Sequence, residues 1–213
     1  MTVNDDRSVT TVAAIADPAP LGLAAFALTT FLLSAANAGW MKSATGDAWL
    51  GYAFAYGGFG QLLAGMWEFR NRNVFGATAF SSYGAFWIGL GLWDKLVAGA
   101  APPAGVSAAA YGAALGHDLG WILLAFAIFN TYMLIWSTQV NAAVFAVFLT
   151  LELTEIFLFI GNLGGNANIV KIGGYIGIIT AIAAWYTSAA GVANGMGGRL
   201  SVPVGRPILG PRV

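Results

Sequence analysis

The 213-residue sequence contains no cysteine and a single histidine, His117. Without cysteine the chain has no disulfide, thiolate nucleophile, iron–sulfur cluster or cysteine-type zinc site, and one histidine argues against a histidine-based metal site. Charged residues make up only 8% of the chain, against about 25% in soluble domains. Nine basic residues balance nine acidic ones, so no excess of positive charge points to nucleic acid. We therefore expect no metal, no cofactor and no nucleic-acid partner.

Apolar residues take the place of the missing charges, since 58% of the chain is hydrophobic. Such a chain cannot build a water-facing surface, so its solvent is the lipid bilayer, whose core takes about 20 apolar residues per helix. Stretches such as 121–129 do not alternate in polarity as barrel strands do. The sequence predicts an all-α integral membrane protein with six transmembrane helices, at approximately 21–41, 48–68, 77–99, 119–138, 141–161 and 169–193.

The spans lie in one transmembrane domain at 17–195, flanked by tails at 1–16 and 196–213. The first tail lacks the apolar core of a cleaved signal peptide, and the second, rich in glycine, proline and arginine, is predicted to be disordered. Basic residues favour the cytoplasmic side, which predicts a multi-pass protein of the plasma (inner) membrane with both termini cytoplasmic. The connection at 100–118, which contains His117, would then face outward. The basic residues placed inside are Arg7, Arg70, Arg72, Arg199, Arg206 and Arg212, and those placed outside are Lys42, Lys95 and Lys171.

Glycine is abundant, with 29 residues in the chain, most of them within the spans. Small residues let membrane helices approach closely, and Gly173 and Gly177 form a GxxxG pair in the last span. Close helix packing is the favoured interpretation of each glycine, and the alternative is that missing side chains leave room for a permeant molecule. The same two interpretations apply to the second span, with Gly57, Gly58, Gly60 and Gly65.

Two carboxyl groups lie deep in the fifth span, where an ionisable side chain is costly and marks a candidate functional site. Glu155 shares one helical face with Leu151, Leu158 and Asn162, and Glu152 lies beside that face. Each carboxyl is either a neutral group hydrogen-bonded to a neighbouring helix or a proton-exchanging, pore-lining group. Both interpretations stay open from the sequence, and the second fits Glu155 better than Glu152.

Amides and glycines fill the segment 161–168 between the last two spans, which contains Asn162 and Asn166. This composition suits a broken or re-entrant backbone that lines a water-filled cavity, and it suits an ordinary polar loop equally well. Three further amides, Asn37, Gln61 and Asn130, lie within spans, where hydrogen bonding between helices is favoured over contact with a ligand.

The first span opens with a helix-start sequence, in which Asp17 can cap the helix, Pro18 can occupy its first position, and Pro20 falls among donors that lack partners. The segment from Asp17 to Leu23 resembles the NPAPLGL signature of the acetate/succinate permease family (SatP/YaaH, AceTr). Blocks at 56–65, 75–87 and 161–166 resemble the same family in the same order, so the resemblance covers residues 17–195. Its entrance motif comprises Asp17, Pro18, Pro20 and Gly22.

The resemblance implies a six-helix protomer similar to the proton-gated urea channels, with a pore in each protomer and a homohexameric assembly. Members of the family carry acetate, and some carry succinate or related short carboxylates, with protons or by a channel-like route. The family's hydrophobic constriction falls on Phe26, Tyr83 and Leu151 of this chain, and the small residue that tunes substrate size falls on Ala184. We expect an acetate transporter, with protons and the lipid bilayer as its other partners.

Two other functions are alternatives to acetate transport. An ammonium or urea channel shares the same architecture and is the alternative function. An intramembrane enzyme would need a nucleophile with a base, or a metal cluster. A chain with no cysteine and one histidine in a predicted loop argues against an enzyme.

The chain departs from the family pattern at two places. Asp17 stands where the family has asparagine, and Glu152 and Glu155 stand where apolar residues are expected. An ionised Glu155 would repel acetate by on the order of several kcal/mol at low effective dielectric. We therefore expect Glu155 to be protonated while the anion passes or to relay the coupled proton, with Asn162 and Asn166 as polar contacts of the substrate.

Overall fold

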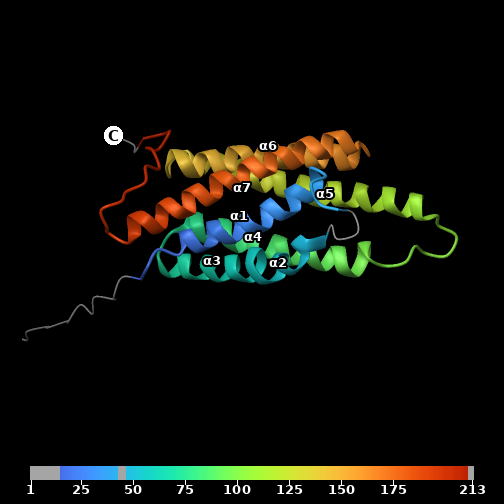
Figure 1. Ribbon diagram of the computed structural model, residues 1–213, viewed down its shortest axis with the longest axis horizontal. Coiled ribbons are helices and arrows are strands. Elements are labelled where there is room, and N and C mark those ends of the chain that lie inside the picture. Colours follow the sequence, from blue (N-terminus) through green and yellow to red (C-terminus); the bar gives the residue numbers. More distant parts are fainter. Residues whose placement is uncertain (1–14, 43–46, 211–213) are drawn as a thin grey trace, which may run out of the picture.

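The computed structural model describes residues 15–42 and 47–210, and every regular element in these ranges is a helix (Figure 1). The predicted all-helical fold is therefore confirmed. Arg7 and Arg212, two of the basic residues used to predict orientation, lie outside the described residues. The elements in chain order are α1 (Ala19–Asn37), α2 (Leu50–Phe54), the π-helical segment η2 (Ala55–Gly60), α3 (Gln61–Arg70), α4 (Val74–Trp93), the π-helical segment η3 (Asp94–Ala98), α5 (Ala108–Ser137), α6 (Ala142–Leu163) and α7 (Ala167–Gly195).

Four of the described helices, α1, α5, α6 and α7, are long and apolar enough to cross a membrane. Their most apolar windows have mean hydropathies of 1.7, 1.8, 2.2 and 1.5. The segments α2, η2 and α3 follow one another without a break and form a continuous rod, and α4 follows after a short turn. The chain is therefore a multi-pass membrane protein, built as a bundle of helices that run along its long axis (Figure 1).

The helix that contains the predicted fourth span begins three helical turns before residue 119. Helix α5 begins at Ala108, where the Ser107 hydroxyl oxygen accepts a hydrogen bond from the Ala110 N–H at 3.2 Å. His117 therefore lies within a helix, and the connecting loop is confined to 99–107. A hydropathy window does not detect these first turns, because glycine, histidine and aspartate lower their mean hydropathy. Their many alanines nevertheless favour a helix.

Glycines on α7 let it pack directly against its two neighbours. A Cβ atom added at Gly174 would lie 2.8 Å from the carbonyl oxygen of Ser34 on α1, and one at Gly173 would lie 2.8 Å from the side chain of Leu158 on α6. One at Gly177 would collide with the Ser34 side chain. The packing interpretation of the Gly173 and Gly177 pair is therefore confirmed.

The connection between α6 and α7 is an ordinary tight turn, so the re-entrant alternative was wrong. Gly165 adopts a φ of 62°, a left-handed conformation that glycine takes without strain. The Asn166 side-chain oxygen then accepts hydrogen bonds from the N–H groups of Asn168 and Ile169, at 3.1 and 3.3 Å, and caps α7.

The C-terminal segment is ordered against the bundle as far as residue 210, contrary to the expected disorder. The Asn194 amide exchanges two hydrogen bonds of 2.9 Å with the backbone of Val202. Further along, the carbonyl oxygen of Val204 accepts a hydrogen bond from the Ala143 N–H at 2.9 Å. These backbone groups tie the segment to the end of the bundle at which α1 begins and α7 ends (Figure 1).

Candidate functional site

The three predicted constriction residues meet in the middle of the bundle. Phe26 comes from α1, Tyr83 from α4 and Leu151 from α6, and all three are buried in one apolar cluster. The rings of Phe26 and Tyr83 pack edge to face, with centroids 5.7 Å apart and planes at 64°. Ala184 on α7 is fully buried in the same cluster, so a larger residue there would press on this group.

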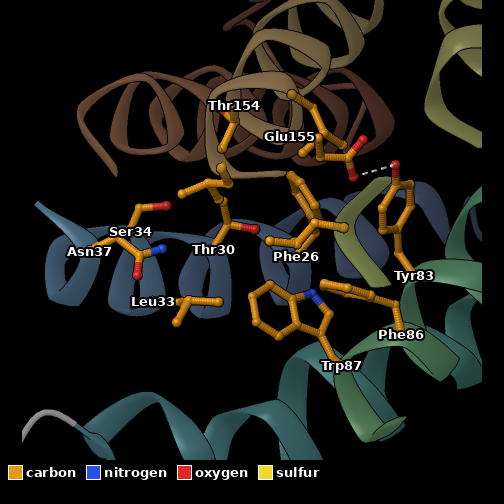
Figure 2. Close-up of a pocket in the computed structure, with 13 residues that line it drawn as sticks. Phe26, Thr30, Leu33, Ser34, Asn37, Tyr83, Phe86, Trp87, Thr154 and Glu155 are labelled. Atoms are coloured by element: carbon orange, nitrogen blue, oxygen red, sulfur yellow. Dashed lines mark hydrogen bonds between the residues drawn. The ribbon is translucent and has the colours of Figure 1, made fainter. Parts of the chain in front are cut away.

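These three side chains separate two small cavities. One cavity, of about 40 Å³, lies on the side of the α6–α7 turn, and it is the space shown in Figure 2. The other, of about 20 Å³, is also lined by Gln61, which is buried on α3. Phe26, Tyr83 and Leu151 are the residues that line both cavities. One phenyl ring, one phenol ring and one isobutyl group therefore lie between the two cavities.

The 40 Å³ cavity continues into wider spaces toward the α6–α7 turn. A space of about 310 Å³, here called the vestibule, shares Asn37, Leu123 and Leu158 with it. The vestibule in turn shares Asn37 and Asn162 with an open mouth of about 710 Å³. Asn37, for which bonding between helices was the favoured interpretation, borders all three spaces.

The two predicted polar contacts lie at this mouth and away from the constriction. Asn162 lines the vestibule and the mouth, with its amide nitrogen donating to the Leu158 carbonyl oxygen at 2.8 Å. Asn166 lines the mouth but not the vestibule, and its side-chain oxygen caps α7 by accepting a hydrogen bond from the Asn168 N–H. Any contact of these two residues with a solute would therefore occur at entry.

The entrance motif lies at the opposite end of the bundle. The Asp17 carboxylate accepts a hydrogen bond from the Ala19 N–H at 2.9 Å, and Pro18 takes the N-cap position with Pro20 in the first turn. Asp17 and Pro20 border a groove of about 500 Å³ between α1 and α7. A Cβ atom added at Gly22 would lie 2.7 Å from the ring of Phe80, so this glycine lets α4 pack closely against α1.

Glu155 faces the constriction and Glu152 does not. Glu155 is 4% exposed and lines the 40 Å³ cavity, and its Oε1 atom accepts a hydrogen bond from the Tyr83 hydroxyl at 3.2 Å. Glu152 lies on the side of α6 that faces α5, partly exposed, with its Oε1 atom 2.8 Å from the Thr131 hydroxyl. The pore-lining interpretation therefore fits Glu155, and the hydrogen-bonded interpretation fits Glu152.

Asn130 joins the two carboxyl groups through the constriction tyrosine. Its amide nitrogen donates to Glu152 Oε2 at 2.8 Å and to the Phe148 carbonyl oxygen at 3.0 Å. Its amide oxygen accepts from the Tyr83 hydroxyl at 3.0 Å. The interpretation of Asn130 as a residue that bonds between helices is confirmed, because these contacts link α5 to α4 and α6. Its contact with Tyr83 could not be found from the sequence, since it depends on how three helices face one another.

A third carboxyl is buried besides the two that the sequence singles out. Glu68 is the last residue of the predicted span 48–68, yet it is fully buried on the face of α3 that also carries Gln61 and Ala64. Its Oε2 atom accepts a hydrogen bond from the Asn71 amide at 3.3 Å. The spacing of Gln61, Ala64 and Glu68 follows a helical face, and this spacing was the available signal. Within the described ranges, no group of three or more histidine, aspartate or glutamate side chains is placed to hold a metal ion.

Comparisons with known proteins identify relatives over nearly the whole chain. The GPR1/FUN34/yaaH family matches residues 2–205. Acetate permease A of Emericella nidulans is 41% identical over 197 residues, which cover 89% of this chain and 65% of that protein. Ammonia transport outward protein 2 of Saccharomyces cerevisiae is 36% identical over 200 residues, covering 91% of this chain and 67% of that protein. The chain thus spans about two thirds of the length of these two fungal relatives.

A bacterial relative matches over almost its full length. The succinate-acetate/proton symporter SatP of Escherichia coli is 35% identical over 192 residues, which cover 90% of this chain and 96% of that protein. A solved structure described as the bacterial acetate channel SatP superposes with a TM-score of 0.78 at 35% identity, covering 90% of this chain and 100% of that one. The helical arrangement of Figure 1 is therefore similar to the fold of a known channel.

Proposed function

Since the chain belongs to the GPR1/FUN34/yaaH family, we propose that it carries acetate, and succinate or related short carboxylates, across a membrane. The observation that carries this proposal is the position of Phe26, Tyr83 and Leu151, which border the cavities on both sides of one closed point. The names of the relatives from Emericella nidulans and Escherichia coli support the choice of substrate. We propose transport and not catalysis as the role of these buried groups.

In the proposed route, a small carboxylate enters by the mouth and meets the amides of Asn37 and Asn162 in the vestibule. It loses part of its water shell at the constriction, where the walls are apolar, and this loss selects small solutes. Glu155 is neutral while the anion passes, because a second negative charge in the 40 Å³ cavity would repel it strongly. Ala184 lies in the same buried cluster as Phe26, Tyr83 and Leu151, and its small side chain sets how wide the passage between them is. Passage is either linked to protons through Glu155 or channel-like.

We further propose six membrane crossings with a pore in each protomer. The rod formed by α2, η2 and α3 has 21 residues, which at 1.5 Å per residue gives about 31 Å, enough for a bilayer core of about 30 Å. Helix α4 has 20 residues. Both carry polar side chains that are buried in the bundle, Gln61 and Glu68 in the rod and Tyr83 in α4.

The proposed orientation places both termini in the cytoplasm and the protein in the plasma (inner) membrane. Arg70 ends α3 and Arg72 lies in the turn that follows, at the end of the bundle where α1 begins (Figure 1). Lys95 lies in η3 and Lys171 in the first turns of α7, at the other end. This distribution agrees with the excess of basic residues found in cytoplasmic loops. A homohexamer, as the family resemblance implies, is the proposed assembly, and native mass spectrometry in detergent would measure it.

The proposal is tested with purified protein in liposomes. Uptake of isotope-labelled acetate is measured with and without an imposed pH gradient, and protein-free liposomes give the background of acetic acid that crosses lipid unaided. Protein-dependent uptake supports the proposal, and a rate equal to the background contradicts it. Accumulation driven by the pH gradient above the level that passive acid exchange produces indicates obligate proton coupling, whereas faster equilibration without accumulation indicates a channel.

Transport of ammonium is the second candidate. It is supported by the name of the relative from Saccharomyces cerevisiae, and by two carboxyl groups, Asp47 and Asp94, that line the vestibule and would attract a cation. The constriction carries no acidic group other than Glu155, which argues for the acetate proposal. The same liposomes separate the two candidates. Uptake of labelled acetate and uptake of a labelled ammonium analogue, methylammonium, are each compared with the protein-free background, and the solute whose uptake depends on the protein is the substrate.

A further inference from the structure

The amide of Asn130 on α5 is fully buried, and α6 fixes its orientation. Its nitrogen donates to Glu152 Oε2 at 2.8 Å and to the Phe148 carbonyl oxygen at 3.0 Å. An amide turned by half a rotation would place its oxygen against the Phe148 carbonyl oxygen, which cannot donate. The oxygen of Asn130 is therefore the atom that faces Tyr83 on α4.

Tyr83 has one hydroxyl proton and two possible acceptors. Its oxygen lies 3.0 Å from Asn130 Oδ1 and 3.2 Å from Glu155 Oε1, and the second contact is the dashed line of Figure 2. An amide oxygen accepts and never donates, so Asn130 is bonded only when the Tyr83 proton points toward it. The contact with Glu155 is then a hydrogen bond only when Glu155 supplies the proton, which requires its neutral form.

The geometry points to Asn130 as a positioning residue that holds Glu155 in its neutral form, acting through the hydroxyl group of Tyr83. This inference deepens the proposed function and rests on it for the link between the charge of Glu155 and the passage of a carboxylate. Asn130 is not among the residues that line the two cavities beside the constriction, so it acts without touching the solute. Glu152 contributes by helping to hold the Asn130 amide in place.

The other surroundings of Glu155 do not favour a negative charge. Its Oε2 atom is buried and has no hydrogen-bond partner among the described residues. The ionisable groups that act on Glu155 are Glu152 and Tyr83, and neither is a cation. Within the described part of the chain, an ionised Glu155 would therefore have only the Tyr83 hydroxyl as a donor, and it would take that donor from Asn130.

The helices packed around this network carry few titratable side chains. Helix α1 has none, and Tyr83 is the one that α4 carries. On α5, Tyr132 acts on Tyr83, and α6 carries Glu152 and Glu155. The other titratable side chains of α5 and α7 lie within about three turns of a helix end, and they are Tyr111, His117, Asp118, Lys171, Tyr175 and Tyr186. The charge of Glu155 is therefore governed by Tyr83, Asn130 and Glu152.

The test follows the protonation of Glu155 by infrared spectroscopy of the purified full-length protein. A neutral carboxyl group has a C=O stretch that an ionised one lacks, and the band that is lost in Glu155→Gln identifies that of Glu155. Its intensity is recorded between pH 5 and 8 in the unaltered protein and in Asn130→Leu, in which the side chain has a similar shape and no acceptor. Asn130→Val removes the same amide with a different shape, and it replaces the leucine variant if that variant does not fold.

Thr131→Val is the matched control. It removes a contact with Glu152 and keeps the hydrogen bond between Asn130 and Tyr83. A double variant, Asn130→Leu with Tyr83→Phe, shows whether Asn130 acts through Tyr83, because two residues on one route do not have additive effects.

In Asn130→Leu the neutral form of Glu155 loses a hydrogen bond of the network, because the Tyr83 proton no longer has an acceptor. The ionised form keeps its donor. We therefore expect the midpoint of the Glu155 band to move about half to one pH unit toward acid, as for the loss of one hydrogen bond. Thr131→Val should keep the midpoint of the unaltered protein, and Asn130→Leu should cause no further shift in the Tyr83→Phe background.

An unmoved midpoint in the Asn130 variants overturns the inference. An equal shift in Thr131→Val, or a shift that persists in the Tyr83→Phe background, also overturns it, because the effect would then reach Glu155 by another route. The absence of a Glu155 band from the unaltered protein over the whole pH range would show an ionised Glu155 and would likewise overturn the inference.

Acetate flux in liposomes separates this inference from the proposed function. The pH at which flux is half-maximal should move with the infrared midpoint in Asn130→Leu. An infrared shift of the expected size in a protein without acetate flux would support the role of Asn130 and contradict the proposed function. Acetate flux through a protein whose infrared midpoint does not respond to Asn130 would overturn the inference and leave the proposed function standing.

Discussion

The hydroxyl group of Tyr83 lies 3.2 Å from Glu155 Oε1 and 3.0 Å from Asn130 Oδ1, so two acceptors face one proton. The Asn130 amide cannot turn around, because its nitrogen already donates to Glu152 and to the Phe148 carbonyl oxygen. If Glu155 is ionised, one acceptor is left without a donor. If Glu155 is neutral, its own O–H donates to the Tyr83 oxygen, and both Tyr83 and the Asn130 amide oxygen are satisfied. The network therefore favours a neutral Glu155 beside the constriction.

Replacing Tyr83 by phenylalanine tests this link between the constriction and Glu155. Tyr83→Phe keeps the ring, so the preference for acetate over succinate should persist. Glu155 loses its hydrogen bond with the Tyr83 hydroxyl, which is worth about 0.5–1.5 kcal/mol. The pH at which flux is half-maximal should therefore move away from that of the unaltered protein. Liposome flux between pH 5 and 8 measures both quantities, and an unmoved midpoint would contradict the network.

Shortening Leu151 should widen the passage. Leu151→Ala removes the isobutyl group that Phe26 and Tyr83 contact in the cluster. We expect the flux of succinate to rise relative to that of acetate, at a cost in stability of about 2–5 kcal/mol. Leu158→Ala, which enlarges only the approach to the constriction, is the matched control. Equal selectivity in the two variants would mean that Leu151 does not limit the passage.

Enlarging Ala184 should have the opposite effect. Its side chain is fully buried against the constriction cluster, so the added atoms of Ala184→Val have to displace a neighbour. Overpacking of this kind costs about 1–3 kcal/mol. Succinate flux should fall before acetate flux does. Ala190→Val, which is also fully buried but outside that cluster, should lower stability without changing the ratio of the two fluxes.

Close contact between α1 and α7 predicts a difference between two glycine substitutions. Gly174→Ala places a methyl group against the backbone of α1, which cannot turn aside as a side chain can. It should lower stability by about 1–3 kcal/mol. Gly112→Ala, in α5 with open space around it, should raise stability by up to about 1 kcal/mol. Thermal unfolding in detergent gives both values, and equal effects would contradict the packing.

The sequence predicted the helical fold and the residues that meet at its centre. Phe26, Tyr83 and Leu151 lie on three helices far apart in the chain, and the family resemblance alone is enough to place them together. The faces of α6 were also predictable from the 3.6-residue period, which places Glu155 with Leu151 and leaves Glu152 to one side. These features depend on local spacing or on a shared motif.

Other features depend on tertiary contacts that spacing does not contain. The first turns of α5 fall outside a hydropathy window, and the order of the C-terminal segment depends on backbone bonds such as that from Ala143 to Val204. Nothing in the sequence reveals that Asn37 borders the 40 Å³ cavity and the vestibule. The Thr30 hydroxyl oxygen and the Trp87 indole nitrogen have no hydrogen-bond partner among the described residues, and only the three-dimensional structure reveals this.

Acetate flux through Glu155→Gln protein as a function of pH tests the central claim most directly. Glutamine is neutral at every pH, so it mimics the state that the account assigns to Glu155 during passage. Flux through the unaltered protein should fall as the pH rises and Glu155 becomes ionised. Flux through Glu155→Gln should stay level across the same range, whereas Glu152→Gln should retain a pH-dependent flux. A Glu155→Gln profile that falls with pH as the unaltered protein does would contradict the account.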